Sequence, residues 1–121
     1  MPTTAEMLES ILNDLKRTGD IEASAIVSRD GLIMASDIPP GIHAEAFAAM
    51  SATMLGAAET ATAELKKGIP DRIIVESAKG KVIAAGAGPK ALLVAMTGSY
   101  AGLGLILVEV ERATENVKEL L

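Results

Sequence analysis

The stretch RIIVESAKGKVIAAGAGPKALLVAM, residues 72–96, decides the fold of this chain. It contains three apolar runs, residues 72–77, 81–86 and 91–96. Short segments with Gly or Pro separate these runs: Lys79-Gly80 lies between the first two and Gly88-Pro89 between the last two. Short runs rich in Val, Ile and Leu between such breaks are typical of β-strands. Because the connections are short, neighbouring strands are expected to pair as hairpins and to form an antiparallel sheet.

A further hairpin is predicted upstream of this stretch. Residues 22–29 (EASAIVSR) and 32–36 (LIMAS) flank the dipeptide Asp30-Gly31. Asp-Gly between two apolar runs favours a type I′ turn, in which both central residues have positive φ. The sequence therefore predicts five strands.

Helices are predicted at both ends of the chain. Thr3 and Glu6 have the spacing of a capping box, and apolar residues then repeat at helical spacing over residues 8–15 until Gly19. Apolar residues follow helical spacing again from residue 103 to the C-terminus. With a long central helix, the expected order is α-β-β-α-β-β-β-α.

The central helix is expected over residues 42–67, which hold nine alanines, one Gly and no Pro. Its apolar positions cover roughly 160° of the helix surface, whereas packing on one sheet needs about 100°. One interpretation is that alanine is a good helix former that tolerates exposure. The other is that the helix also packs on a partner subunit, where Met50 and Met54 form an adaptable surface and Ala57 and Ala61 allow close approach. A twofold homodimer is the simplest source of such a surface.

Composition excludes several classes of protein. The chain has 121 residues, the size of one domain, and its net charge of −5 argues against a nucleic-acid surface. It has no Cys and one His, His43, so thiolate chemistry and a His-rich metal site are excluded. The 18 uncharged residues 91–108 are interrupted by glycines, and residues 1–20 lack an apolar signal-peptide core. We therefore expect a cytoplasmic protein without a membrane span.

No motif predicts catalysis. The segment GSYAGLG, residues 98–104, has neither Walker nor G-x-G-x-x-G spacing, and no carboxylates are fixed beside a base. His43 lies at a helix entry, which accounts for a polar residue there. Arg29, next to a hairpin turn, is the one arginine in the position expected of a projecting finger. The sequence predicts a protein that is not an enzyme and that uses no cofactor or metal.

Three segments together resemble the roadblock family, the dynein-light-chain roadblock-type domains, which include prokaryotic regulators of Ras-like GTPases. They are AIVSRDGLIMAS (residues 25–36), DRIIVESAKGKVIAAGAG (71–88) and ALLVAMTGSYAGLGLILVEVERA (91–113). The resemblance implies one roadblock-type domain over residues 1–121. It also implies an α+β, profilin-like α-β-β-α-β-β-β-α sandwich, whose five-stranded antiparallel sheet carries helices on both faces.

The resemblance also implies homodimerisation through the long helix and the strand that follows it. On this chain the expected dimer interface consists of Met50, Met54, Ala57, Ala61, Arg72, Ile74 and Glu76. The implied function is that of a homodimeric, non-enzymatic regulator or binding partner of a small Ras-like GTPase. Two alternatives stay open: a dimeric structural adaptor without nucleotide sensitivity, and a small-ligand sensing module of profilin or PAS-like shape. The family assigns no residue of this chain to partner binding.

Overall fold

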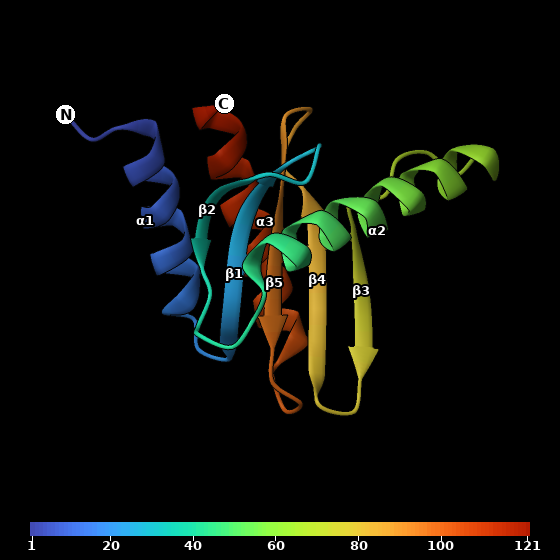
Figure 1. Ribbon diagram of the computed structural model, residues 1–121. Coiled ribbons are helices and arrows are strands. Elements are labelled where there is room, and N and C mark those ends of the chain that lie inside the picture. Colours follow the sequence, from blue (N-terminus) through green and yellow to red (C-terminus); the bar gives the residue numbers. More distant parts are fainter.

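The computed structural model describes all residues, 1–121, and contains the eight elements in the predicted order (Figure 1). They are α1 (Thr4–Lys16), β1 (Ile21–Ser28), β2 (Ile33–Asp37), α2 (Ala44–Glu64), β3 (Arg72–Ser77), β4 (Gly80–Gly86), β5 (Ala91–Thr97) and α3 (Leu103–Leu120). The capping box is confirmed, because the Glu6 amide donates to Thr3 Oγ1 at 3.1 Å and the Glu6 side chain accepts from the Thr3 amide.

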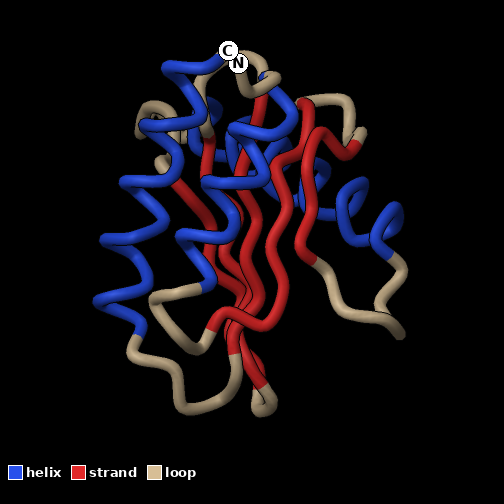
Figure 2. Tube along the Cα trace, turned by 90° about the vertical axis from the view of Figure 1, so that its left-hand side faces the viewer, coloured by secondary structure: helices blue, strands red, loops and turns tan.

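The five strands form one antiparallel sheet in the order β2-β1-β5-β4-β3. Strand β5 pairs with both β1 and β4, so it joins the two hairpins in the middle of the sheet, and β2 and β3 are the edges. Helices α1 and α3 cover one face and α2 covers the other, as the side view shows (Figure 2). The predicted α+β sandwich with helices on both faces is confirmed.

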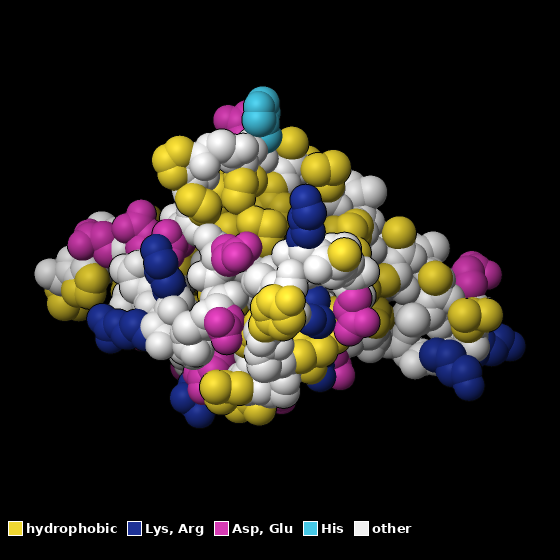
Figure 3. Space-filling view, turned by 90° about the horizontal axis from the view of Figure 1, so that it is seen from below, with side chains coloured by type: hydrophobic (Ala, Val, Ile, Leu, Met, Phe, Trp, Pro, Cys, Tyr) yellow, Lys and Arg dark blue, Asp and Glu magenta, His cyan; other side chains and the backbone are white.

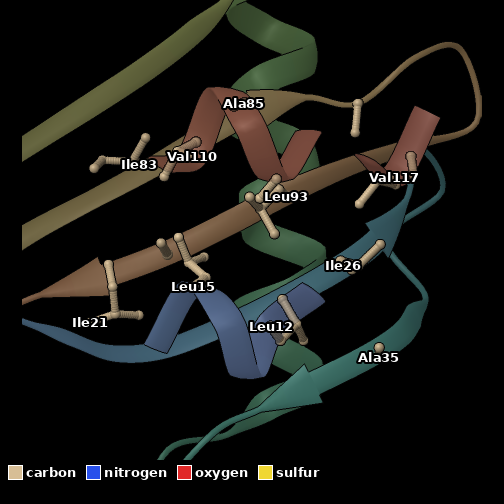
Figure 4. Close-up of a cluster of buried hydrophobic side chains, with 14 of the residues drawn as sticks. Leu12, Leu15, Ile21, Ile26, Ala35, Ile83, Ala85, Leu93, Val110 and Val117 are labelled. Atoms are coloured by element: carbon tan, nitrogen blue, oxygen red, sulfur yellow. The ribbon is translucent and has the colours of Figure 1, made fainter. Parts of the chain in front are cut away.

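Each face of the sheet has its own hydrophobic core. The core under α1 and α3 is the larger, and strand residues such as Ile26, Ile83 and Leu93 meet leucines of α1 and valines of α3 there (Figure 4). The core under α2 is smaller, and its helix contributes only Ala48 and Leu55 as fully buried hydrophobic residues. Because few residues of α2 are buried, much of its predicted apolar arc remains outside the core.

The first hairpin differs from its prediction at the turn. Gly31 has a φ of +91°, but Asp30 does not have positive φ, so the predicted type I′ turn is wrong. The Gly31 amide donates to the Ser28 carbonyl at 2.9 Å, and the Ser28 amide donates to the Leu32 carbonyl at 2.8 Å. A three-residue loop of this kind needs only one left-handed residue. A Cβ at Gly31 would lie 3.1 Å from Ala49 Cα, so the glycine also lets α2 approach the turn.

The second hairpin turns at Ala78 and Lys79, one residue earlier than the Lys79-Gly80 turn expected from the sequence. Ser77 pairs directly with Gly80, which is the first residue of β4. A Cβ at Gly80 would collide with the carbonyl oxygen of Thr97 on β5. The glycine is therefore required by close strand packing.

Candidate interaction surface

The one histidine of the chain lies apart from any cluster of metal-ligating side chains. His43 occupies the N-cap position of α2, is exposed and makes no side-chain capping bond. No three His, Cys, Asp or Glu side chains cluster as metal ligands would. None of the helices has the length and hydrophobicity that crossing a membrane requires.

Arg29 does not project from the molecule. Its Nη1 lies 3.2 Å from both carboxylate oxygens of Glu59 on α2, and its Nη2 donates to the Gly88 carbonyl at 2.8 Å. Both side chains of the ion pair are only 31% exposed. A Cβ at Gly86 would lie 3.0 Å from Nη2, so this glycine leaves room for the guanidinium. The hypothesis of an arginine finger is wrong for this conformation: Arg29 ties the first hairpin to α2 and to the β4–β5 loop.

The Arg29–Glu59 pair forms one wall of an open cleft of about 790 Å³. The cleft lies where the start of β3, the end of β4 and the second half of α3 meet. Its charged lining residues carry both signs: Arg29, Arg72, Lys118, Glu59, Asp71, Glu111 and Glu115. Lys118 is already paired with Glu115 at 3.0 Å. The nearly balanced charge gives the cleft no strong preference for an anion or a cation.

One flank of α2 carries an apolar stripe that lies outside the core. Its members repeat at helical spacing, and we call them the α2 stripe: Met50, Met54, Ala57, Ala61 and Leu65. Met50 is 60% exposed and Leu65 is 69% exposed. The stripe contains the four α2 residues of the predicted dimer interface, so the structure brings these four together.

The second half of α2 extends past the edge strand β3, and part of the sheet beside it is left bare (Figure 1). Val75 on this face of β3 is 42% exposed, and its neighbour Val82 on β4 is partly buried. Seen from below, hydrophobic side chains gather between the histidine at the start of α2 and the strand ends (Figure 3). The α2 stripe therefore adjoins an uncovered apolar strip of the sheet.

The three predicted interface residues on β3 lie on the face of the sheet that α1 and α3 cover, opposite to the face that carries α2. Ile74 pairs with Ile83, which belongs to the core under α1 and α3. Arg72 and Glu76 share that face with Ile74 because side chains alternate along a strand. The predicted interface is thus divided between the α2 stripe on one face of the sheet and the β3 residues on the other face.

Comparison with known families decides where this fold belongs. The Roadblock/LC7 domain model matches residues 7–97, which span α1 to the end of β5. The chain belongs to the Roadblock/LC7 family. This roadblock domain is 35% identical over 114 residues to the uncharacterized protein MJ1340 of Methanocaldococcus jannaschii, covering 94% of this chain and 99% of the relative. The uncharacterized protein MJ0310 of the same organism is 34% identical over the same coverage.

Solved structures extend the likeness to the whole fold, including α3. Myxococcus xanthus MglB superposes with a TM-score of 0.91 at 15% identity, covering 99% of the roadblock domain and 91% of that chain. The gliding protein MglB from Thermus thermophilus gives 0.90 at 18% identity, covering 99% and 92%. Acanthamoeba castellanii profilin II gives 0.67 at 18% identity, covering 90% and 94%. The roadblock architecture and its profilin-like character are therefore shown.

Proposed function

We propose that this roadblock domain is a homodimeric, non-enzymatic regulator of a small Ras-like GTPase in the cytoplasm. The observation that carries the proposal is the α2 stripe beside a free edge strand, in a family that includes prokaryotic regulators of such GTPases. A contiguous apolar surface of this kind, rimmed by polar residues, is typical of a protein–protein contact.

The shape of one subunit supports self-association. A twofold axis normal to the sheet at the β3 edge would set two β3 strands side by side and make one sheet of two subunits. The same rotation would carry the overhanging end of each α2 onto the bare strip of the other subunit, near Val75 and Val82. One operation would therefore cover both the free edge and the exposed strip, which is how an isologous interface works.

Regulation without catalytic groups requires differential binding. The switch loops of a Ras-like GTPase are ordered by contacts to the γ-phosphate and are released on hydrolysis. A dimer that binds one arrangement of these loops more tightly than the other shifts the conformational equilibrium of the GTPase toward that arrangement. The size of the shift equals the difference between the two affinities. The composite sheet with its pair of α2 helices would provide that contact surface.

The proposal is tested by a nucleotide-dependent pull-down with the small GTPases of the source organism. Each GTPase is loaded with GDP or with a non-hydrolysable GTP analogue, and hydrolysis and exchange rates are then measured with and without the roadblock domain. We expect preferential binding to one nucleotide state and a changed rate. Equal binding to both states with unchanged rates would contradict regulation and support the adaptor function instead.

A further inference from the structure

We infer that the free edge of β3 selects a second copy of this chain in one register, with Arg72 opposite Glu76 of the partner subunit and Ile74 at the twofold axis. The inference rests on the proposed homodimer and goes beyond it, because it assigns a specificity role to two charged side chains. Three features of β3 together lead to this register.

The first feature is the direction of the backbone groups. The Asp71 carbonyl accepts a hydrogen bond from the Gly86 amide at 3.2 Å, so it points toward β4. In an antiparallel ladder the amide and carbonyl of one residue point the same way, and the direction alternates along the strand. The groups that point to the free edge therefore belong to Arg72, Ile74 and Glu76.

The second feature is the number of pairs that each register allows. A twofold axis normal to the sheet leaves the same face of both subunits on the same side. Residues that lie opposite one another across the axis must therefore point to the same face. With Ile74 at the axis, all three edge-facing residues of one subunit meet edge-facing residues of the other, and each pair exchanges two hydrogen bonds. A shift by two residues in either direction leaves only two such pairs.

The third feature is the match of side chains. In the register centred on Ile74, the two isoleucines meet on one face, and Ile73 meets Val75 of the partner subunit on the other. A shift by two residues would place Arg72 or Glu76 against the partner's Ile74. Cross-strand pairs of opposite charge stabilise a sheet, whereas a charge facing an apolar side chain does not.

The two charged residues have no ion pair within the subunit. The five ion pairs of the structure involve neither Arg72 nor Glu76. Glu76 lies opposite Lys81 on β4, so across the dimer the order on this face would be Lys81, Glu76 and then the partner's Arg72. The sign of the charge alternates along this row, and the row occurs twice by symmetry.

This order of charges would make the edge selective. An exposed edge strand can pair with any suitable strand, and complementary charges are a common way to favour one partner over others. Methanocaldococcus jannaschii encodes at least three relatives of this chain at 32–35% identity, so one genome can hold several similar chains. Arg72 and Glu76 would favour the pairing of identical copies.

The test uses the charge reversals Arg72→Glu and Glu76→Arg, with dimer dissociation measured by sedimentation at low salt. Each variant alone brings like charges together at both symmetric positions. We therefore expect the dissociation constant of its dimer to rise roughly tenfold. An equimolar mixture restores opposite charges at both positions, so heterodimers should regain the wild-type affinity. This rescue should weaken in high salt. Arg17→Glu changes the net charge by the same amount as Arg72→Glu, on an exposed part of the chain far from β3, and should have no effect.

The outcomes separate the two levels of the proposal. A wild-type protein that stays monomeric would overturn the homodimer and the register together. A wild-type dimer with both variants unaffected would overturn the register alone. Loss of affinity in both variants without rescue in the mixture would also overturn it, because the two residues would then not face each other.

Discussion

The guanidinium of Arg29 lies 3.2 Å from the carboxylate of Glu59, and this ion pair fixes α2 to the turn of the first hairpin. A second bond from the same guanidinium reaches the Gly88 carbonyl in the β4–β5 loop. Three separate parts of the chain thus meet at one side chain. This geometry assigns Arg29 to holding α2 in place, with both Nη1 and Nη2 bonded within the subunit.

Replacing Arg29 by Ala should lower the free energy of unfolding by about 1–2 kcal/mol, because a half-buried charge-assisted network is lost. Urea denaturation measures this change. Arg17→Ala is the matched control, because Arg17 is 80% exposed and its pair with Asp14 should contribute much less. Regulation of the GTPase should survive in Arg29→Ala. A loss of about 10³-fold in stimulated hydrolysis with unchanged binding would instead establish an arginine finger.

The α2 stripe is tested by two alanines of the same helix. Ala57 belongs to the stripe, whereas Ala63 is exposed outside it. Ala57→Glu should weaken the dimer by roughly tenfold or more, because a carboxylate is costly in an apolar contact. Ala63→Glu should leave the dimer unchanged. Light scattering over a dilution series measures both, and equal effects of the two changes would contradict the assignment of the stripe.

Proline substitutions distinguish the amides of β3 that point to the free edge from those that bond to β4. The Ile74 amide points to the free edge, so Ile74→Pro should leave the subunit folded and prevent dimerisation. The Ile73 amide points to β4, so Ile73→Pro should cost about 1–3 kcal/mol of subunit stability. Thermal unfolding monitored by circular dichroism, together with the sedimentation coefficient, distinguishes the two effects. A stable dimer of Ile74→Pro would show that the edge is not used.

Two buried serines are predicted to be replaceable. Ser24 and Ser51 are fully buried, and their hydroxyl oxygens have no hydrogen-bond partner. Ser24→Ala and Ser51→Ala should each be neutral or stabilise the fold by up to about 1 kcal/mol, because an unsatisfied polar atom is removed. Ser28→Ala is the control, since the Ser28 hydroxyl accepts from the Leu32 amide at 3.0 Å and its loss should destabilise. A destabilisation of the first two variants as large as that of Ser28→Ala would contradict the prediction.

The elements of the fold could be predicted because each depends on neighbouring residues. The capping box of α1 and the apolar runs of β3 to β5 are local patterns, and the structure confirms them. The turn at Asp30 was predicted with the wrong type because its loop length depends on pairing, and Gly31 is also constrained by its contact with Ala49. Composition and spacing cannot supply such a contact.

The surfaces could be predicted only in part. The helical spacing of the α2 stripe was visible in the sequence. So was the alternation along β3, which places Glu76 on one face of the strand and Ile73 and Val75 on the other. The partners of Arg29 were not visible, because Glu59 and Gly88 lie 30 and 59 residues away in the chain. The free edge at β3 likewise depends on the order of the strands in the sheet, which no local pattern encodes.

The central claim is that a homodimer of this chain binds a Ras-like GTPase in one nucleotide state. Native mass spectrometry of mixtures with a GTPase in its GDP and GTP-analogue forms measures copy number and nucleotide preference together. We predict a complex that contains two copies of this 12.4 kDa chain and forms with one nucleotide state only. A complex with a single copy, or equal complexes with both states, would contradict it.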